Sequence, residues 1–256
     1  MWIRTLVLTL LAGSPAALAA DSALVYDIRS GDRIVGSRTV AVRVVPPDGD
    51  LIPETRLITS ITKVDTTVAG VPMRLHSRAD ARATDRKISF VASTVTNGDS
   101  VEIQARQVPD GSWMVTALTP GNIQEMTYRA VEVDLTSMDL LDPMRARLFT
   151  ADLGTAELLL AETGTVVEGS VRDGGPVEMK IGGVTVPGRR VELALPTGTS
   201  AFVWSDQGLL LQQDLSVLGT RLTATLRALP AARTWGQVEV ATEFTTPGTS
   251  IHEQEL

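Results

Sequence analysis

Residues 221–228, Arg-Leu-Thr-Ala-Thr-Leu-Arg-Ala, alternate strictly between polar and apolar side chains. Leu222, Ala224, Leu226 and Ala228 fall on one side of an extended chain, and the arginines and threonines fall on the other. Successive side chains of a β-strand point to opposite faces of the sheet. This period of two therefore predicts a half-buried strand with Leu226 in the core and Arg227 in water.

The same alternation recurs along the whole chain. Strands are expected near residues 24–29, 33–45, 54–67, 88–96, 101–106, 113–118, 126–135, 157–160, 165–171, 177–181, 190–195, 201–204, 209–216, 221–228 and 238–244. Between them stand pairs that tolerate positive φ, namely Gly31-Asp32, Asn97-Gly98, Asp110-Gly111, Gly174-Gly175, Gly182-Gly183 and Gln207-Gly208. Many short strands joined by tight turns predict an all-β fold of antiparallel curved sheet or sheets, as a sandwich or half-barrel.

One short central helix interrupts the strands. Asp142 suits its N-cap, Pro143 suits its first position, and the helix would continue to Phe149. We therefore expect an N-terminal β half over residues 20–135, a central helix region over 136–150 and a C-terminal β half over 151–244. Two arrangements remain open: separate β domains, or one curved sheet wrapped about the helix. Residues 245–256 show no periodicity and are expected to form a flexible tail.

Residues 70–87 fit two patterns. Arg74, His76, Arg78 and Arg82 alternate with small or apolar residues, which is typical of a strand, but arginines spaced by four also mark a helical face. We favour the strand, because the segment follows a Gly70-Val71-Pro72 turn and leads into another strand at Ile88.

Residues 1–19 have the pattern of a secretory signal peptide. Arg4 supplies the positive charge, a short apolar run follows, and Ala17-Leu18-Ala19 predicts cleavage before Ala20. A membrane anchor is disfavoured because Gly13 to Pro15 interrupts the apolar run well short of the roughly 20 residues that span a bilayer. No later segment is apolar enough to span one, so we expect a periplasmic protein without a transmembrane segment after cleavage.

Composition excludes several functional classes. The 256 residues carry a net charge of -7, which disfavours binding to nucleic acid. There is no cysteine, and His76 and His252 are the two histidines, so we expect no disulfide, no cysteine nucleophile, no metal site and no cofactor. The absence of cysteine is compatible with the periplasm, where disulfides are permitted but not required.

Two segments resemble known exported proteins. Leu24–Ile28 with Gly31–Arg38, and Ala201–Asp214 with its Trp204-Ser205-Asp206-Gln207-Gly208 turn, resemble exported β-rich proteins of unknown function. That group has curved sheets similar to those of periplasmic lipoprotein carriers. The resemblance implies a concave sheet that holds acyl chains, with the helix at Pro143 as a lid, and it implies no catalytic residue.

Candidate binding residues are of two kinds. Trp204 and Trp113 would wall an apolar pocket in a curved sheet, although tryptophans are more often plain core. Arg74, His76 and Arg78 would bind an anion or a lipid headgroup, although such charges more often form a solvated strand face.

The favoured hypothesis is a periplasmic, non-enzymatic β protein that binds an envelope partner or an apolar ligand, such as a lipid or a lipoprotein acyl chain. One alternative is a structural or adaptor module of the cell envelope that binds another protein by a sheet edge. The other is a hydrolase with a carboxylate site. Aspartates near the expected helix are interpreted as caps and turns, which disfavours the hydrolase.

Overall fold

The computed structural model describes residues 23–47, 53–68, 70–84, 87–142, 154–196, 198–217 and 220–230. The expected signal peptide, the helix from Pro143 to Phe149, the strand near 238–244 and the tail 245–256 lie outside these residues. Within them, no helix has the length and apolar character needed to cross a membrane.

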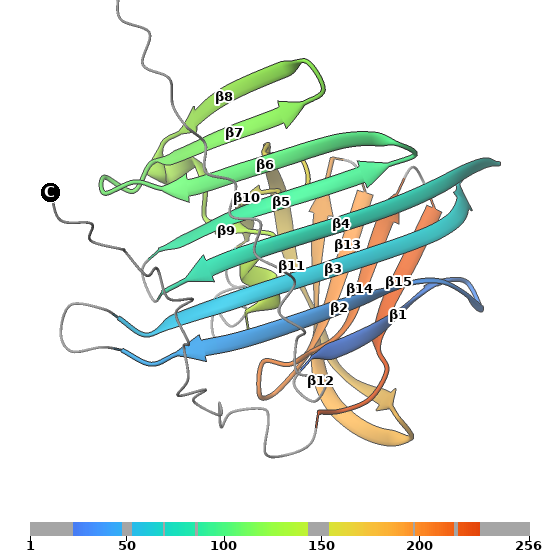
Figure 1. Cartoon of the computed structure of the whole chain (residues 1–256). Helices are drawn as coiled ribbons and strands as arrows, with labels where there is room; N and C mark the ends of the chain where they lie inside the picture. The colour runs from blue at the N-terminus through green and yellow to red at the C-terminus, as the bar shows by residue number, and fades with distance from the viewer. Residues whose placement is uncertain are drawn as a thin grey trace, which may run out of the picture.

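The described residues form strands almost throughout (Figure 1). The N-terminal strands are β1 (Leu24–Ser30), β2 (Arg33–Val45), β3 (Thr55–Val68), β4 (Val71–Ala83), β5 (Ile88–Thr96), β6 (Asp99–Gln107), β7 (Trp113–Thr119) and β8 (Asn122–Tyr128). Two 3₁₀ turns, η1 (Ala130–Glu132) and η2 (Asp139–Leu141), flank β9 (Leu135–Thr136). The C-terminal strands are β10 (Thr155–Leu159), β11 (Val166–Ile181), β12 (Val184–Leu195), β13 (Gly198–Ser205), β14 (Leu210–Val217) and β15 (Thr220–Leu226).

All fifteen of these strands belong to one sheet, in the order β8-β7-β6-β5-β4-β3-β2-β1-β15-β14-β13-β12-β11-β10-β9. Each half of the chain is a meander of neighbouring strands, and the antiparallel pairing of β1 with β15 joins the halves. Only β9 and β10 run parallel among the paired strands of the described residues. The prediction of an all-β, antiparallel curved fold is confirmed.

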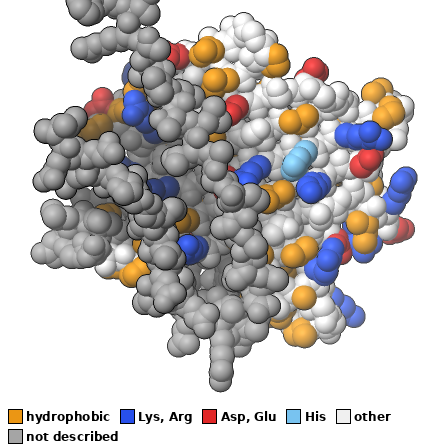
Figure 2. Space-filling model, viewed as in Figure 1, with side chains coloured by type: hydrophobic (Ala, Val, Ile, Leu, Met, Phe, Trp, Pro, Cys, Tyr) orange, Lys and Arg blue, Asp and Glu red, His pale blue; other side chains and the backbone are white. Residues whose placement is uncertain are grey.

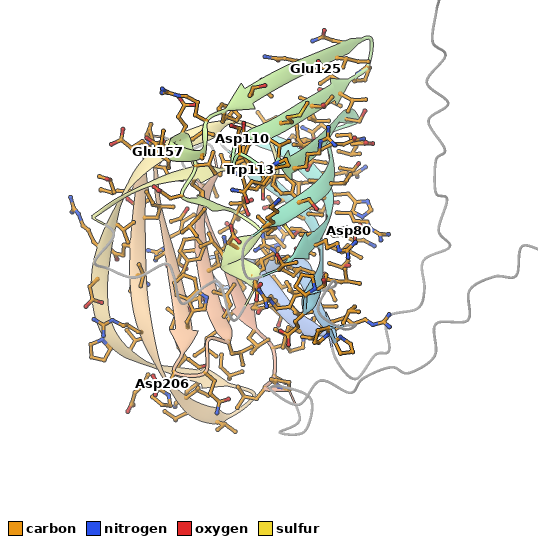
Figure 3. All side chains as sticks on the ribbon, turned by 90° about the vertical axis from the view of Figure 1, so that its left-hand side faces the viewer. Asp80, Asp110, Trp113, Glu125, Glu157 and Asp206 are labelled. Atoms are coloured by element: carbon orange, nitrogen blue, oxygen red, sulfur yellow. The ribbon has the colours of Figure 1, made fainter. Side chains whose placement is uncertain are left out.

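The sheet folds over so that its halves face each other as two layers with side chains between them (Figure 3). On one side of this interior, the Tyr26 hydroxyl donates to the carbonyl oxygen of Leu210 at 2.9 Å. On the other, the Tyr128 hydroxyl donates to the carbonyl oxygen of Gly164 at 3.1 Å. Gly164 lies so close to β7 that an added Cβ would stand 2.9 Å from a methyl group of Val115. The fold is therefore a half-barrel with a packed interior.

Residues 71–83 form strand β4, as the alternation predicted. Ala79, Ala81 and Ala83 face the interior and are buried, whereas Arg74, His76 and Arg78 face outward and are exposed. The small side chains leave room for larger partners: Ala81 lies opposite Ile58 of β3 and Phe90 of β5. Packing of these pairs stabilises the strand over the helix.

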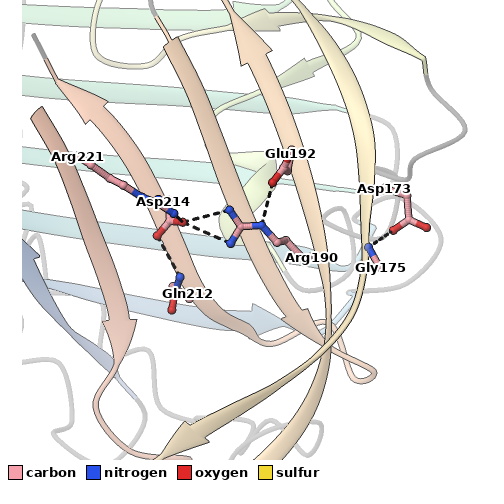
Figure 4. A network of polar contacts seen from close by, with 7 residues as sticks. All are labelled: Asp173, Gly175, Arg190, Glu192, Gln212, Asp214 and Arg221. Atoms are coloured by element: carbon pink, nitrogen blue, oxygen red, sulfur yellow. Dashed lines mark hydrogen bonds and ion pairs between the residues drawn. The ribbon is translucent and has the colours of Figure 1, made fainter. Parts of the chain in front are cut away.

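One predicted turn is wrong. Gly174-Gly175 does not separate two strands but forms a bulge within the long strand β11, between Asp173 and Gly175 opposite β12. Gly175 takes a φ of +81°, and its N–H donates to the Asp173 carboxylate at 2.9 Å (Figure 4). A glycine pair supports either a turn or a bulge, and here the continuous register on both sides selects the bulge.

The strand expected near residues 126–135 also differs. Strand β8 begins earlier, at Asn122, because Gly121 with a φ of +81° makes a tight turn after β7. It ends at Tyr128, where the Arg129 N–H donates to the Glu132 carboxylate at 2.7 Å and a 3₁₀ turn begins.

The core position of Leu226 gives a direct test of the register. Leu226 is 2 % exposed and lies opposite Tyr26 across the pair that joins the halves. We expect Leu226→Ala to lower the free energy of unfolding by about 2–5 kcal/mol, because it leaves a cavity in the core. Urea denaturation followed by circular dichroism measures this.

The neighbouring Arg227 serves as the control. It is exposed and pairs with Asp27 at 2.6 Å on the outer face. Arg227→Ala should leave the denaturation midpoint close to that of the unchanged protein. Equal losses in the two variants would contradict the assigned register.

Candidate functional site

A row of polar side chains crosses the interior face of the N-terminal half. Arg38 of β2, Thr62 of β3, Ser77 of β4 and Thr94 of β5 are successive register partners, and we call them the Arg38 row. Tyr26 of β1 continues the register on the other side of Arg38. Polar side chains at positions whose alternation points inward are uncommon in a core and must be hydrogen-bonded.

Neutral groups hold the Arg38 guanidinium. Its Nε donates to the Thr62 hydroxyl at 3.0 Å, and its Nη1 donates to the side-chain oxygen of Gln213, which comes from β14 in the other half. The Ser77 and Thr94 hydroxyls share a hydrogen bond of 3.0 Å. Within the described residues, Arg38 forms no ion pair with a carboxylate.

Burial changes the pKa values of Arg38 and of its neighbour Tyr26. Burial lowers the pKa of Arg38, and the Glu162 carboxylate and the Tyr26 phenol oppose part of that fall. Burial likewise raises the pKa of the Tyr26 phenol, and the Arg38 charge opposes part of that rise. Both changes have the sign expected when a charged form loses its hydration. A cation in such a place is costly unless an anion accompanies it.

Other arginines of the protein show the usual arrangement. Arg56, with 3 % of its side chain exposed, donates through Nε to the fully buried Asp142 carboxylate at 2.8 Å, and Glu54 lies 3.4 Å away. Arg190 contacts both Glu192 at 3.0 Å and Asp214 at 3.4 Å, and Arg221 pairs with the same Asp214 (Figure 4). Arg38 differs from both sites because its hydrogen-bond acceptors are uncharged.

On β3 and β4 the Arg38 row lies between two hydrophobic clusters. The first cluster holds Tyr26, Val64 and Met73 with most of the C-terminal half, and the second holds Ile58, Phe90 and Trp113 with the end of β10. Along β3 the order is Ile58, Ser60, Thr62, Val64, so the polar residues lie between an apolar residue of each cluster. On β2, Val40 belongs to the first cluster, so the half-buried Arg38 lies beside that cluster.

The Arg38 row is less buried than the rest of the interior face. Arg38, Ser77 and Thr94 are half-buried, whereas Ala92 and Ile103 on the same face are almost fully buried. Tyr26 and Thr62, the register partners of Arg38 on either side, are buried. The partly exposed Arg38 guanidinium therefore lies next to apolar side chains.

Glu162 supplies the nearby negative charge. It lies in the turn between β10 and β11, is exposed, and accepts a hydrogen bond of 3.4 Å from the Ser137 hydroxyl. Its carboxylate acts on Arg38 through space, without an ion pair between the two. Glu162 therefore lowers the positive potential at Arg38 but forms no ion pair with it.

The two tryptophans proposed from the sequence lie in the interior. Trp204 is 7 % exposed and stacks on Phe202 with ring centres 5.2 Å apart, in the first cluster. Trp113 is 3 % exposed and tilts against Phe90 at 6.4 Å, in the second cluster (Figure 3). Both are packed core residues, and their contact with a ligand stays a prediction.

The three basic candidates lie on the opposite face of the sheet. Arg74 pairs with Asp65 at 3.3 Å, and Arg78 pairs with Asp80 at 2.7 Å, which raises the pKa of Arg78. Arg74 and His76 line a shallow surface hollow of about 760 Å³, on a face where basic, acidic and apolar side chains are interspersed (Figure 2). The structure therefore does not bring these residues together with the tryptophans. Their role in binding stays a prediction.

Arg38 is not among the candidates predicted from the sequence. In the alternating series Gly36, Arg38, Val40 and Val42, a charged residue occupies an inward-facing position, and Val40 of this series is buried. Thr62 and Ser77 likewise occupy inward-facing positions on β3 and β4. Within the described residues, no group of three or more acidic or histidine side chains is placed to hold a metal ion.

Comparison with known proteins supports the fold. No family model matches the sequence, and no curated protein is similar to it. A solved structure, the β-barrel-like protein of a domain of unknown function, DUF1849, from Brucella abortus, is similar over 80 % of this chain and 95 % of its own. The TM-score is 0.53 and the sequence identity is 14 %. The likeness shows a β-barrel-like fold.

Because Arg56 pairs with a carboxylate and Arg38 does not, their replacement should change the free energy of unfolding differently. Arg56→Met removes the ion pair to the buried Asp142 carboxylate and should lower the free energy of unfolding by about 3–5 kcal/mol. Arg38→Met removes a poorly hydrated cation and leaves only neutral partners, so it should leave that free energy unchanged or raise it. Chemical denaturation of both variants measures the difference. A loss at Arg38 as large as that at Arg56 would assign Arg38 a structural role.

Proposed function

We propose that this protein binds an amphipathic ligand, with an apolar chain and an anionic group, inside the folded sheet. The observation that carries the proposal is the Arg38 row, in which a half-buried cation is held by neutral groups beside a hydrophobic cluster. Folding alone would favour apolar side chains at these positions, because unpaired buried charge destabilises a core. A ligand that brings both an anion and a hydrocarbon chain would satisfy both features.

We also propose the chemical class of the ligand and the compartment in which it binds. The ligand would be a lipid or an acyl chain. Two segments of the sequence resemble exported β-rich proteins whose curved sheets are similar to those of lipoprotein carriers. Binding would take place in the periplasm after removal of residues 1–19, and no chemical step is required of the protein. The half-barrel fold supports this proposal, because curved sheets commonly enclose apolar ligands between their layers.

The adaptor alternative has one observation in its favour. Strand β8 is an edge of the sheet, and most of its residues, among them Ile123, are exposed. An extended segment of another protein could add to such an edge. The hydrolase alternative gains nothing, because Asp139 accepts hydrogen bonds from the Thr136 N–H and hydroxyl while Asp142 pairs with Arg56.

Filling the interior tests the proposal. Thr94 of β5 faces the interior and is half-buried, and its neighbour Ser93 faces outward and is exposed. Thr94→Phe should weaken binding of N-phenyl-1-naphthylamine, a neutral apolar fluorescent probe, by roughly tenfold or more, because the ring occupies space that the probe needs. Fluorescence titration gives both affinities.

Ser93→Phe is the matched control, since it adds the same ring to the outer face of the same strand. Its affinity for the probe should equal that of the unchanged protein. No probe binding by the unchanged protein, or an equal loss in both variants, would refute an interior site. Co-purification of a protein partner without any lipid would favour the adaptor.

A further inference from the structure

We propose that the anionic group of the ligand is a single carboxylate that pairs with Arg38, so that the site selects fatty-acid-like monoanions over phosphate-headed lipids. This inference rests on the proposed interior site. It adds the chemical class of the headgroup.

The hydrogen-bond donors of Arg38 fit one small anion. A guanidinium has five N–H groups. The Nε group is engaged by Thr62 and one Nη1 hydrogen by Gln213, and no acceptor in the described residues engages Nη2. The neighbouring Tyr26 hydroxyl donates to Leu210 and is not available to a ligand. Three N–H groups therefore remain, one on Nη1 and two on Nη2, and a pair of them matches the two oxygens of a carboxylate.

The charge of the site fits a monoanion. The interior positions next to the Arg38 row carry no second cation in the described strands: Val40 adjoins on β2, Ser60 and Val64 on β3, and Leu75 and Ala79 on β4. Glu162 already contributes a negative potential at Arg38. One bound negative charge would be balanced by Arg38. A second negative charge, as on a phosphate monoester, would have no cation to balance it, and apolar surroundings destabilise an unbalanced charge.

The surroundings also fit a hydrocarbon chain. Leu75 precedes Ser77 on the interior face of β4 and packs against the first cluster. Val101, the register partner of Thr94, continues the row onto β6 and packs against the second cluster. A chain attached to a carboxylate at Arg38 would therefore meet apolar side chains both beside the row and at its end.

Competition with three ligands of equal chain length tests the inference. Dodecanoate, 1-dodecanol and dodecyl phosphate each displace bound N-phenyl-1-naphthylamine, and the fluorescence loss gives their affinities. Dodecanoate should bind about tenfold to a hundredfold more tightly than dodecanol, the range of a charge-assisted hydrogen bond, and also more tightly than dodecyl phosphate.

Charge variants should shift this order in opposite directions. Arg38→Gln should remove the preference for dodecanoate over dodecanol, whereas Arg38→Lys should retain part of it because the charge persists. Glu162→Gln, in an exposed turn, should tighten dodecanoate and should tighten dodecyl phosphate more, because the opposing charge is gone. Arg82→Gln removes the same charge from the exposed outer face of β4 and should change none of the three affinities.

The outcomes separate the two proposals. Equal affinities of the unchanged protein for dodecanoate and dodecanol would overturn the carboxylate inference while leaving an apolar site intact. Tighter binding of dodecyl phosphate than of dodecanoate would overturn it in favour of a phosphate headgroup. Weaker dodecanoate binding in Glu162→Gln would overturn the role of Glu162, even if Arg38→Gln did not fold. Absence of probe binding would overturn the interior site itself.

Discussion

The antiparallel pairing of β1 with β15 holds the two halves of the sheet together. It joins two meanders from opposite ends of the chain into one sheet and places Tyr26 opposite Leu226. Because the sheet bends there, side chains of β1 and β2 reach across to β14: Tyr26 to Leu210, and Arg38 to Gln213. Without this pairing each half would be an open sheet with one apolar face in water, and neither would enclose an interior.

The polar residues of the Arg38 row are unusual because they face the interior of the folded sheet. On an exposed sheet face, an arginine beside threonine and serine would be unremarkable. Beside the first hydrophobic cluster, the same arginine loses hydration that its neutral partners restore only in part. The protein shows at Arg56 and Asp142 that it can neutralise a buried arginine internally. The different arrangement at Arg38 is the physical basis for assigning it to a ligand.

The sequence predicted the sheet better than the site, for identifiable reasons. Alternation locates a strand and its two faces, so β4 and the burial of Leu226 followed from local pattern. Long-range information was needed elsewhere. Nothing local distinguishes a bulge at Gly174-Gly175 from a turn, and nothing local reveals that Arg38 lies between two layers and not in solvent. The basic candidates Arg74 and Arg78 formed a more conspicuous pattern but lie on the outer face with their own carboxylates.

A crystal structure of the protein with an ω-brominated dodecanoate, in which anomalous scattering locates the bromine, would show where the ligand binds. We expect the carboxylate within hydrogen-bond distance of the Arg38 guanidinium, and the bromine between the layers among residues of one hydrophobic cluster. Bromine on the outer face of β3–β5, with the carboxylate at Arg74 or His76, would rule out an interior site at Arg38.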